Sequence, residues 1–138
     1  MAGTIDMQDM MYLNLFTNIT RVRTPHCFKY NETIFFCVPK NLVSKAIGEG
    51  GKNTKRMNNI LNKKIKIIPL PRDLGDLKNF VKNIVDPVIF KDIQTKDNQV
   101  TLTASTQSKA ALIGRNKRRL MEMQSIIKDF FGKEFRIV

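Results

Sequence analysis

Apolar residues recur along the chain with two spacings, one typical of helices and one typical of strands. Within residues 73–84 the apolar positions follow the three- and four-residue spacing of an amphipathic helix, at Leu77, Phe80, Val81 and Ile84. Residues 99–105, QVTLTAS, alternate between polar and apolar side chains, which predicts a strand with one buried face. Residues 32–38, ETIFFCV, are rich in β-branched and aromatic side chains and predict another strand.

Taken in order, these patterns predict the same series of elements twice. Each series has a helix, two strands joined by a tight turn, a short helix, a turn that contains glycine, a longer helix and a last strand. The predicted helices cover residues 4–16, 40–47, 52–61, 73–84, 106–113 and 117–131, and the last strands cover residues 64–68 and 134–138. The predicted fold class is therefore α+β, with the order α-β-β-α-α-β in each half.

An internal repeat supports this division. When Gly48 is placed over Gly114, the apolar positions of the two halves agree over about forty residues. Examples of matched pairs are Ile34 with Val100, Phe36 with Leu102, Ile47 with Ile113 and Met57 with Met123. Pro69, Pro71 and Gly75 mark the seam, because proline cannot continue a strand interior. We therefore expect two units, residues 1–70 and 71–138.

Each half carries a turn of unusual composition between its short and its longer helix. The first turn is Gly48-Glu49-Gly50-Gly51, and the second is Gly114-Arg115-Asn116-Lys117. Glycine lets the chain reverse without Cβ clashes and lets another backbone approach closely. The following helix directs its unpaired N–H groups and positive dipole end at the turn, which suits phosphate groups. The candidate residues for binding a sugar–phosphate backbone are Ile47, Gly48, Glu49, Gly50, Gly51, Lys52, Lys55, Arg56, Ile113, Gly114, Arg115, Asn116, Lys117 and Arg118.

The charge of the chain agrees with such a ligand. Lys and Arg number 24 against 12 Asp and Glu, which gives a net charge of +12. A charge of this sign and size favours nucleic acid or another anionic surface as the partner. A genome biased toward lysine codons is the alternative explanation. The cations gather around the two turns, and residues 109–119 hold five of them without an acid.

The first turn also carries a resemblance. IGEGGKN after NLVSKA, within an α-β-β-α-α-β unit, resembles the GXXG loop of a type II KH domain. Two such units in succession resemble the archaeal NusA-like transcription factors over nearly the whole chain. LIGRNKRRL is similar to the second loop of that family, and DPVIFKDI to the strand entry before it. The resemblance implies tandem type II KH domains that bind single-stranded RNA in transcription elongation and termination, with RNA polymerase as a further candidate partner.

Two residues depart from the expected loop. Lys117 stands where the closing glycine should be, and its Cβ is unfavourable if the turn needs a positive φ there. That loop would then hold a phosphate by charge more than by close approach. Glu49 places a carboxylate beside the expected phosphate path, where it should point to solvent and weaken binding slightly.

Other interpretations stay open at this point. Residues 48–51 can be a purely structural turn between helices, and residues 115–119 can be a solvated helix face. A KH protein can also act in ribosome assembly or RNA decay. A protein-interaction adaptor that docks on RNA polymerase would need no RNA contact at the loops.

Enzymatic and metal chemistry are not indicated. The chain has no arrangement of Ser, His and Asp or of Cys and His for catalysis, and no phosphate-binding loop of the Walker type. His26, Cys27 and Cys37 are too few and too irregularly spaced for a metal site. A hairpin that turns near residues 30–31 would place Cys27 opposite residues 34 or 35, so no disulfide is expected. We expect no catalytic residue, cofactor, small-molecule substrate or membrane partner, and a cytosolic protein without signal peptide.

Overall fold

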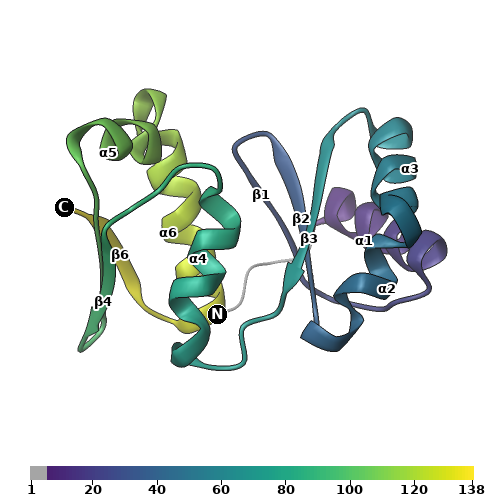
Figure 1. The fold of residues 1–138 in the computed structure, drawn as a ribbon, viewed down its shortest axis with the longest axis horizontal. Helices are drawn as coiled ribbons and strands as arrows, with labels where there is room; N and C mark the ends of the chain where they lie inside the picture. Colours follow the sequence, from purple (N-terminus) through teal and green to yellow (C-terminus); the bar gives the residue numbers. More distant parts are fainter. Residues whose placement is uncertain (1–5) are drawn as a thin grey trace. The chain divides into compact units, whose positions relative to one another are not determined.

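The computed structural model of the chain describes residues 6–138, which form two compact units (Figure 1). One unit ends at Leu70 and the other begins at Pro71. The first unit contains α1 (Met7–Thr20), β1 (Cys27–Tyr30), β2 (Thr33–Val38), η1 (Lys40–Leu42), α2 (Val43–Ile47), η2 (Glu49–Gly51), α3 (Lys52–Leu61) and β3 (Lys64–Pro69). The second contains η3 (Leu74–Asp76), α4 (Leu77–Val85), β4 (Asp92–Lys96), β5 (Gln99–Thr103), α5 (Thr106–Ile113), η4 (Arg115–Lys117), α6 (Arg118–Phe131) and β6 (Glu134–Ile137). The predicted α+β class is confirmed, and the arrangement is consistent with two tandem KH-like domains.

The two sheets have the same topology. In the first unit the strand order is β1-β2-β3, in which β2 pairs antiparallel with β1 and parallel with β3. In the second unit β5 pairs in the same way with β4 and β6. The predicted equivalence of the two central strands is therefore confirmed.

The offset between equivalent residues of the two units increases from 66 to 70 at their last strands. Ile34 and Val100 are 66 positions apart, but their parallel partners Ile65 and Phe135 are 70 apart. The reason lies in the preceding helices, since α3 has 10 residues and α6 has 14. Four residues are about one helical turn, so the last strand still leaves from the same side of the helix and pairs in the same register.

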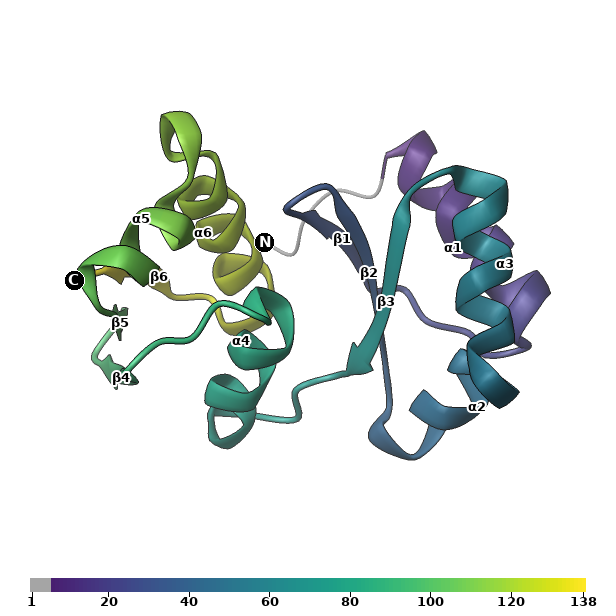
Figure 2. The same cartoon turned by 45° about the horizontal axis from the view of Figure 1, so that its top comes forward.

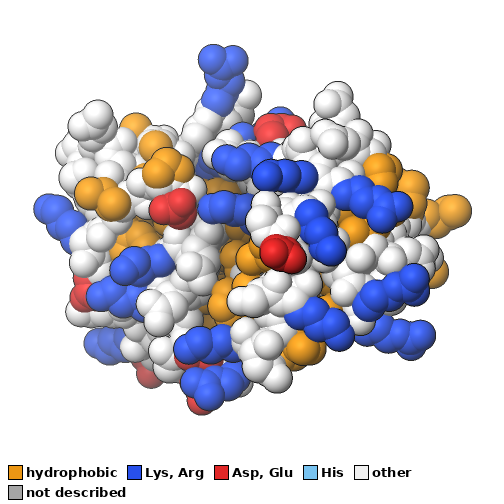
Figure 3. All heavy atoms as spheres, turned by 45° about the vertical axis from the view of Figure 1, so that its right-hand side comes forward, with side chains coloured by type: hydrophobic (Ala, Val, Ile, Leu, Met, Phe, Trp, Pro, Cys, Tyr) orange, Lys and Arg blue, Asp and Glu red, His pale blue; other side chains and the backbone are white. Residues whose placement is uncertain are grey.

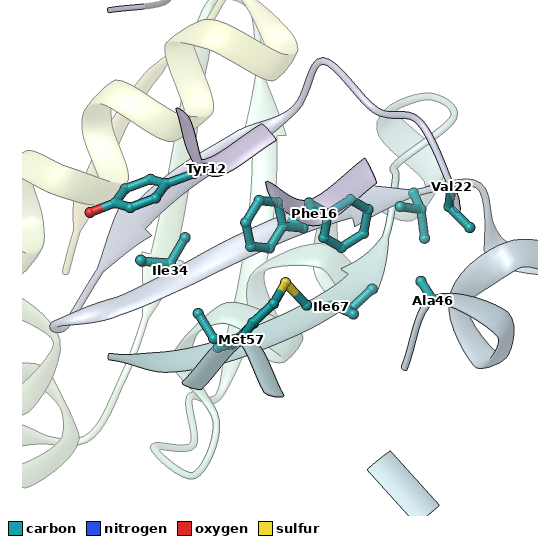
Figure 4. Packing of buried hydrophobic residues seen from close by; sticks show 10 residues of the cluster. Tyr12, Phe16, Val22, Ile34, Ala46, Met57 and Ile67 are labelled. Atoms are coloured by element: carbon teal, nitrogen blue, oxygen red, sulfur yellow. The ribbon is translucent and has the colours of Figure 1, made fainter. Parts of the chain in front are cut away.

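Three helices cover one face of the first sheet. In Figures 1 and 2, α1, α2 and α3 all lie on the same side of the β1-β2-β3 sheet. Figure 4 shows side chains from α1, α3 and β3, among them Phe16, Met57 and Ile67, pointing toward one another. The rings of Phe16 and Phe36 stack with their centroids 4.4 Å apart. Burial of this apolar cluster fixes the height and angle of α2 and α3, and hence of the turn between them.

The second unit builds its core from equivalent elements. α4 buries Leu77, Phe80, Val81 and Ile84, the positions on which its helical prediction rested, and also Val85. The Phe80 ring contacts both Phe130 and Phe131 of α6, with centroids 4.9 and 5.9 Å away. The additional helical turn of α6 thus supplies aromatic packing for the first helix of its own unit.

The predicted bounds of both opening helices need correction. The expected helix at residues 4–16 begins outside the described residues, and α1 continues four residues beyond it, to Thr20. In this last turn the Thr17 and Thr20 hydroxyls donate to carbonyl oxygens four residues earlier, at 3.0 and 2.7 Å, so these polar groups are satisfied within the helix. In the second unit, the expected helix at 73–84 starts as a 3-10 turn, which Asp73 caps by accepting from the Gly75 N–H.

The turn of the first hairpin lies one residue later in the chain than predicted. Its turn lies at Asn31 and Glu32, both with positive φ, so Cys27 pairs with Phe36 and not with residue 34 or 35. Asparagine tolerates the left-handed region, which favours the later turn. Neighbouring residues of a strand point to opposite faces, so Cys37 points away from Cys27 although it follows Phe36. Both cysteines are free thiols, as expected.

Candidate nucleic-acid interface

The first glycine turn requires its glycines. Gly48, Gly50 and Gly51 have φ values of 82°, 62° and 75°, all in the region that L-residues rarely adopt. The turn is closed by a hydrogen bond of 3.0 Å, in which the Gly51 N–H donates to the Gly48 carbonyl oxygen. A Cβ on Gly48 would meet the Asn53 side chain at 2.9 Å, whereas a Cβ on Gly50 would meet nothing within 4 Å. Gly50 therefore leaves its backbone open to an approaching chain.

The second turn has the same backbone conformation although it contains one glycine. Gly114 has φ 75° and ψ 174°, close to the 82° and 162° of Gly48. Asn116 and Lys117 have φ values of 56° and 60°, so both occupy the left-handed region. The positive φ that we expected to be unfavourable at Lys117 is therefore adopted. Such a conformation costs about 1–2 kcal/mol for a residue with a Cβ, and less for asparagine.

Side chains from the following helix hold the first turn in place. Asn53 donates from its side-chain amide to the Ala46 carbonyl oxygen at 3.1 Å, which ties the end of α2 to the start of α3. The Thr54 hydroxyl donates to the Gly51 carbonyl oxygen at 2.8 Å. Both contacts use backbone acceptors, so neither occupies a backbone N–H group of α3, although the Lys52 N–H already donates to the Glu49 carbonyl oxygen.

The starts of α3 and α6 differ from those of two other helices. α1 and α5 have side-chain caps, because Asp6 accepts from the Asp9 N–H and Ser105 from the Ser108 N–H. α3 and α6 have left-handed residues at the cap position and no side-chain cap. The first N–H groups of a helix carry a partial positive charge, so these two starts favour an anion.

A groove runs along α3 on the side that faces β3. We call it the strand-side groove; it has a volume of about 370 Å³ and is lined by Thr54, Lys55, Asn58, Asn59, Lys64 and Ile65. Its walls are polar side chains at the four-residue spacing of one helix face, and Ile65 adds an apolar surface. Such a groove offers hydrogen-bonding groups and an apolar surface to bases, beside a turn that suits their phosphates.

A second hollow lies on the other side of the turn. We call it the α1-side hollow; it has a volume of about 540 Å³ and is lined by Ile19, Thr20, Ser44, Lys45, Gly48, Glu49, Lys52, Asn53 and Arg56. It thus joins the end of α1 to both helices around the turn. Glu49 contributes the single carboxylate of this lining, against three cations.

The candidate residues of the first unit therefore divide between two sides. Gly48, Glu49, Lys52 and Arg56 line the α1-side hollow, and Lys55 lines the strand-side groove. Gly50 and Gly51 form the turn between them. Ile47 is half-buried, packs against the apolar cluster and lines neither hollow, whereas Ile65 belongs to that cluster and borders the strand-side groove.

The second unit has different side chains around a similar turn. Arg115, Lys117 and Arg118 are exposed, and Ile113 is half-buried. The Arg119 guanidinium pairs with the Glu122 carboxylate at 2.8 Å, with both side chains largely buried. Met121, which is 62% exposed, stands 66 positions after Lys55. The second unit thus presents cations at the turn and an apolar side chain on the helix behind it.

Basic side chains dominate the face that carries the first turn. Figure 3 brings forward the side on which α1, α2 and α3 are drawn, and Lys and Arg greatly outnumber Asp and Glu on it. Within the part of the chain that the structure describes, no ion pair joins Lys45, Lys52 or Arg56 to a carboxylate. Their charge is therefore available to an external anion.

The remaining chemistry-bearing residues lie elsewhere. Burial raises the pKa of the Cys27 thiol to about 12, with a further contribution from the nearby Asp9 carboxylate, and burial also raises the pKa of Cys37. Burial lowers the pKa of His26. Residues 6–138 hold no group of three His, Cys, Asp or Glu side chains placed to bind a metal ion. No helix in the same range has the length and apolar character to cross a bilayer.

Comparison with known proteins identifies similar chains. The chain is 31% identical over 114 residues to the probable transcription termination protein NusA of Methanococcus vannielii, which covers 80% of this chain and 64% of that protein. It is 26% identical over 125 residues to the protein of the same name from Methanocaldococcus jannaschii, covering 88% of this chain and 67% of that one. The chain is similar to both of these NusA proteins. It thus spans about two thirds of the length of these relatives, and no protein-family model matches it.

A solved structure agrees in fold. The chain aligns with the crystal structure of APE1850 at a TM-score of 0.65 and 26% identity, over 97% of this chain and 99% of that one. The likeness therefore includes both units. It supports the α+β architecture described above.

Several lining residues of the two hollows were not among the candidates. Thr54, Asn58 and Asn59 of the strand-side groove are uncharged, and Lys64 and Ile65 lie on a strand at the end of the unit. The four-residue spacing of Thr54 and Asn58 was the available signal, because it places both on one face of α3. Ile19 and Thr20 of the α1-side hollow come from a helix about thirty residues before the turn, and nothing local in the sequence connects them to it.

Proposed function

We propose that this chain is a single-stranded RNA-binding protein of transcription termination and elongation, and that it holds RNA at its glycine turns. Each unit is then one type II KH domain, with the boundary between residues 70 and 71. The observation that carries the proposal is the first turn: its backbone is open at Gly50, it is followed by an uncapped helix start, and unpaired cations flank it. The names of both relatives support the setting, since they are named as transcription termination proteins and not as enzymes.

RNA fits this site better than a compact anion does. The strand-side groove continues the turn and adds Ile65 and the side-chain amides of Asn58 and Asn59 to the cations. Bases that are not stacked in a duplex can lie on such a surface while their phosphates contact the turn. In a termination setting, the RNA emerging from RNA polymerase is the ligand we propose, with the polymerase as a second partner.

The proposal is tested by comparing matched single and double strands. Random-sequence RNA octamers should bind more tightly than the same octamers annealed to their complements, because the groove beside the turn admits unstacked bases. Affinity should fall steeply with salt, by about 0.7 log units per tenfold increase in salt for each phosphate contact. A mobility-shift titration at several salt concentrations measures both. Equal or tighter binding of the duplex would contradict the KH mechanism, and salt-independent or absent binding would favour an adaptor that docks on protein.

A further inference from the structure

We propose that the α1-side hollow is a second phosphate-binding subsite, which receives the RNA strand after it has crossed the first glycine turn. This inference rests on the proposed binding of RNA at that turn and extends the path of the strand beyond the strand-side groove. The first unit would then contact RNA on both sides of α3.

The geometry of α3 makes the two sides continuous. Lys52 and Arg56 are four residues apart and line the α1-side hollow, while Thr54 and Asn58, also four apart, line the strand-side groove. The buried Met57 lies between these two faces on the helix circumference and anchors the helix to the core. Gly48 belongs both to the turn and to the lining of the hollow. A strand that lies over the turn therefore meets the hollow directly.

The charges in the hollow match a phosphodiester. Lys45 reaches it from α2, and Lys52 and Arg56 reach it from α3, so cations stand on two of its walls. None of the three forms an ion pair in the described part of the chain. The hydroxyl of Ser44 and the side-chain amide of Asn53 add polar groups to the same lining. Glu49, at the rim formed by the turn, is the only acid there, and the net charge of the lining stays positive.

The internal repeat shows that this charge is not a consequence of the fold. The cations stand at different positions in the second unit, 66 residues later. Ala111 replaces Lys45, Glu122 replaces Arg56 and Asp86 replaces Thr20, whereas Arg118 replaces Lys52 and Arg115 replaces Glu49. Glu122 is moreover paired with Arg119, which replaces Asn53. The two turns share a backbone conformation, yet the cations at the positions of Lys45 and Arg56 are found in the first unit and not at the equivalent positions of the second.

If the hollow binds phosphate, the first unit contacts more nucleotides than a KH groove alone. A KH groove with its GXXG loop holds about four nucleotides. A strand that also fills the α1-side hollow needs additional nucleotides on one side of those four. The contribution of the hollow should therefore depend both on RNA length and on the cations of the hollow, and this second dependence separates it from a general attraction between a basic protein and RNA.

The experiment compares random-sequence RNA tetramers and octamers, labelled with fluorescein, by fluorescence anisotropy. The test variant is Lys45→Gln with Arg56→Gln, both exposed positions on helix surfaces. The matched control is Lys29→Gln with Lys40→Gln, which removes the same charge from exposed positions outside both linings. At 0.1 M salt each lost phosphate contact should weaken binding about fivefold, so the test variant should lose roughly 10- to 30-fold for the octamer. Its tetramer affinity should change less than about twofold, and its octamer salt slope should fall by about 1.4.

Each possible result either supports or overturns the inference. A loss confined to the octamer and absent from the control variant supports it. Equal losses for tetramer and octamer, losses matched by the control, or no loss at all overturn it, while RNA binding at the turn would stand. Failure of the unaltered protein to bind either RNA overturns the proposed function and the inference with it. Circular dichroism melts of all variants verify that they remain folded.

Discussion

The replacement of Gly50 by aspartate or by asparagine separates charge from shape at the proposed phosphate path. The two side chains have nearly the same size, and both tolerate the left-handed conformation that this position requires. The chain itself provides a precedent, because Asn116 occupies the equivalent position of the second turn, with φ 56° and ψ 28° against 62° and 17° for Gly50. Gly50→Asn is therefore the matched control for Gly50→Asp.

Both variants should remain folded. A Cβ on Gly50 meets nothing within 4 Å, so neither substitution creates a clash. The left-handed conformation costs about 1–2 kcal/mol at most, and the lower chain entropy of the unfolded variant offsets about 0.5–1 kcal/mol of that. A net loss of about 1 kcal/mol or less shifts the Tm by no more than about 4–8 °C for a unit of this size.

RNA affinity should differ sharply between the two. An aspartate carboxylate about 4 Å from a bound phosphate is repelled by about 1 kcal/mol in a water-like environment and by about 4 kcal/mol at an effective dielectric constant of 20. Since 1.4 kcal/mol is a factor of ten, Gly50→Asp should bind a random-sequence octamer roughly 10- to 100-fold more weakly than Gly50→Asn. Anisotropy titrations at 0.1 M salt, with thermal melts, provide the measurement. Equal affinity of two folded variants would refute a phosphate path over Gly50.

Three further predictions concern the second turn, His26 and the thiols. Lys117→Gly should raise the free energy of unfolding by up to about 1 kcal/mol in denaturant titrations, because glycine relieves the left-handed lysine, and a loss of stability would contradict this account. Because burial lowers the pKa of His26, the unfolded chain binds more protons near its ordinary value of 6.5, so stability should be complete above that pH and decrease as the pH falls toward the lower folded pKa. Melts of the protein and of His26→Gln between pH 5 and 7.5 check this, and an unchanged pH dependence in the variant would contradict it. With its pKa raised to about 12, Cys27 should react with a thiol reagent at pH 8 far more slowly in the folded protein than in denaturant, and similar rates in both would contradict its burial.

The sequence predicted the elements wherever local pattern and tertiary packing agree. The apolar spacing of α4 is the spacing of its buried face, and the alternation in β5 matches its half-buried pattern. The bounds of α3 coincide with residues 52–61, because glycine and asparagine in left-handed conformations mark both of its ends. Predictions that rest on residues with a specific backbone role were therefore the most accurate.

Other features depend on contacts that no local pattern reveals. The last turn of α1 is mostly polar, so the apolar spacing predicted a helix end that was too early. In the structure Thr20 is buried there, with its hydroxyl bonded back to the Phe16 carbonyl oxygen. Ile60 matches Ile126 in the repeat, yet Ile60 is 54% exposed and Ile126 is 3% exposed. The α1-side hollow likewise requires the packing of α1 against α2 and α3, which unites residues distant in sequence.

The parallel pairing of β2 with β3 determines the order in which the first unit can assemble. Tyr30 and Thr33 pair across a short turn, so the β1–β2 hairpin closes early, whereas Thr33 pairs with Lys64 only after α2 and α3 have spanned the distance between them. The glycine turn lies in the middle of this crossover and acquires its conformation when the crossover closes. A ligand that requires this conformation binds the assembled unit and not the hairpin. Such a ligand should therefore slow the unfolding of the unit and leave its folding rate unchanged.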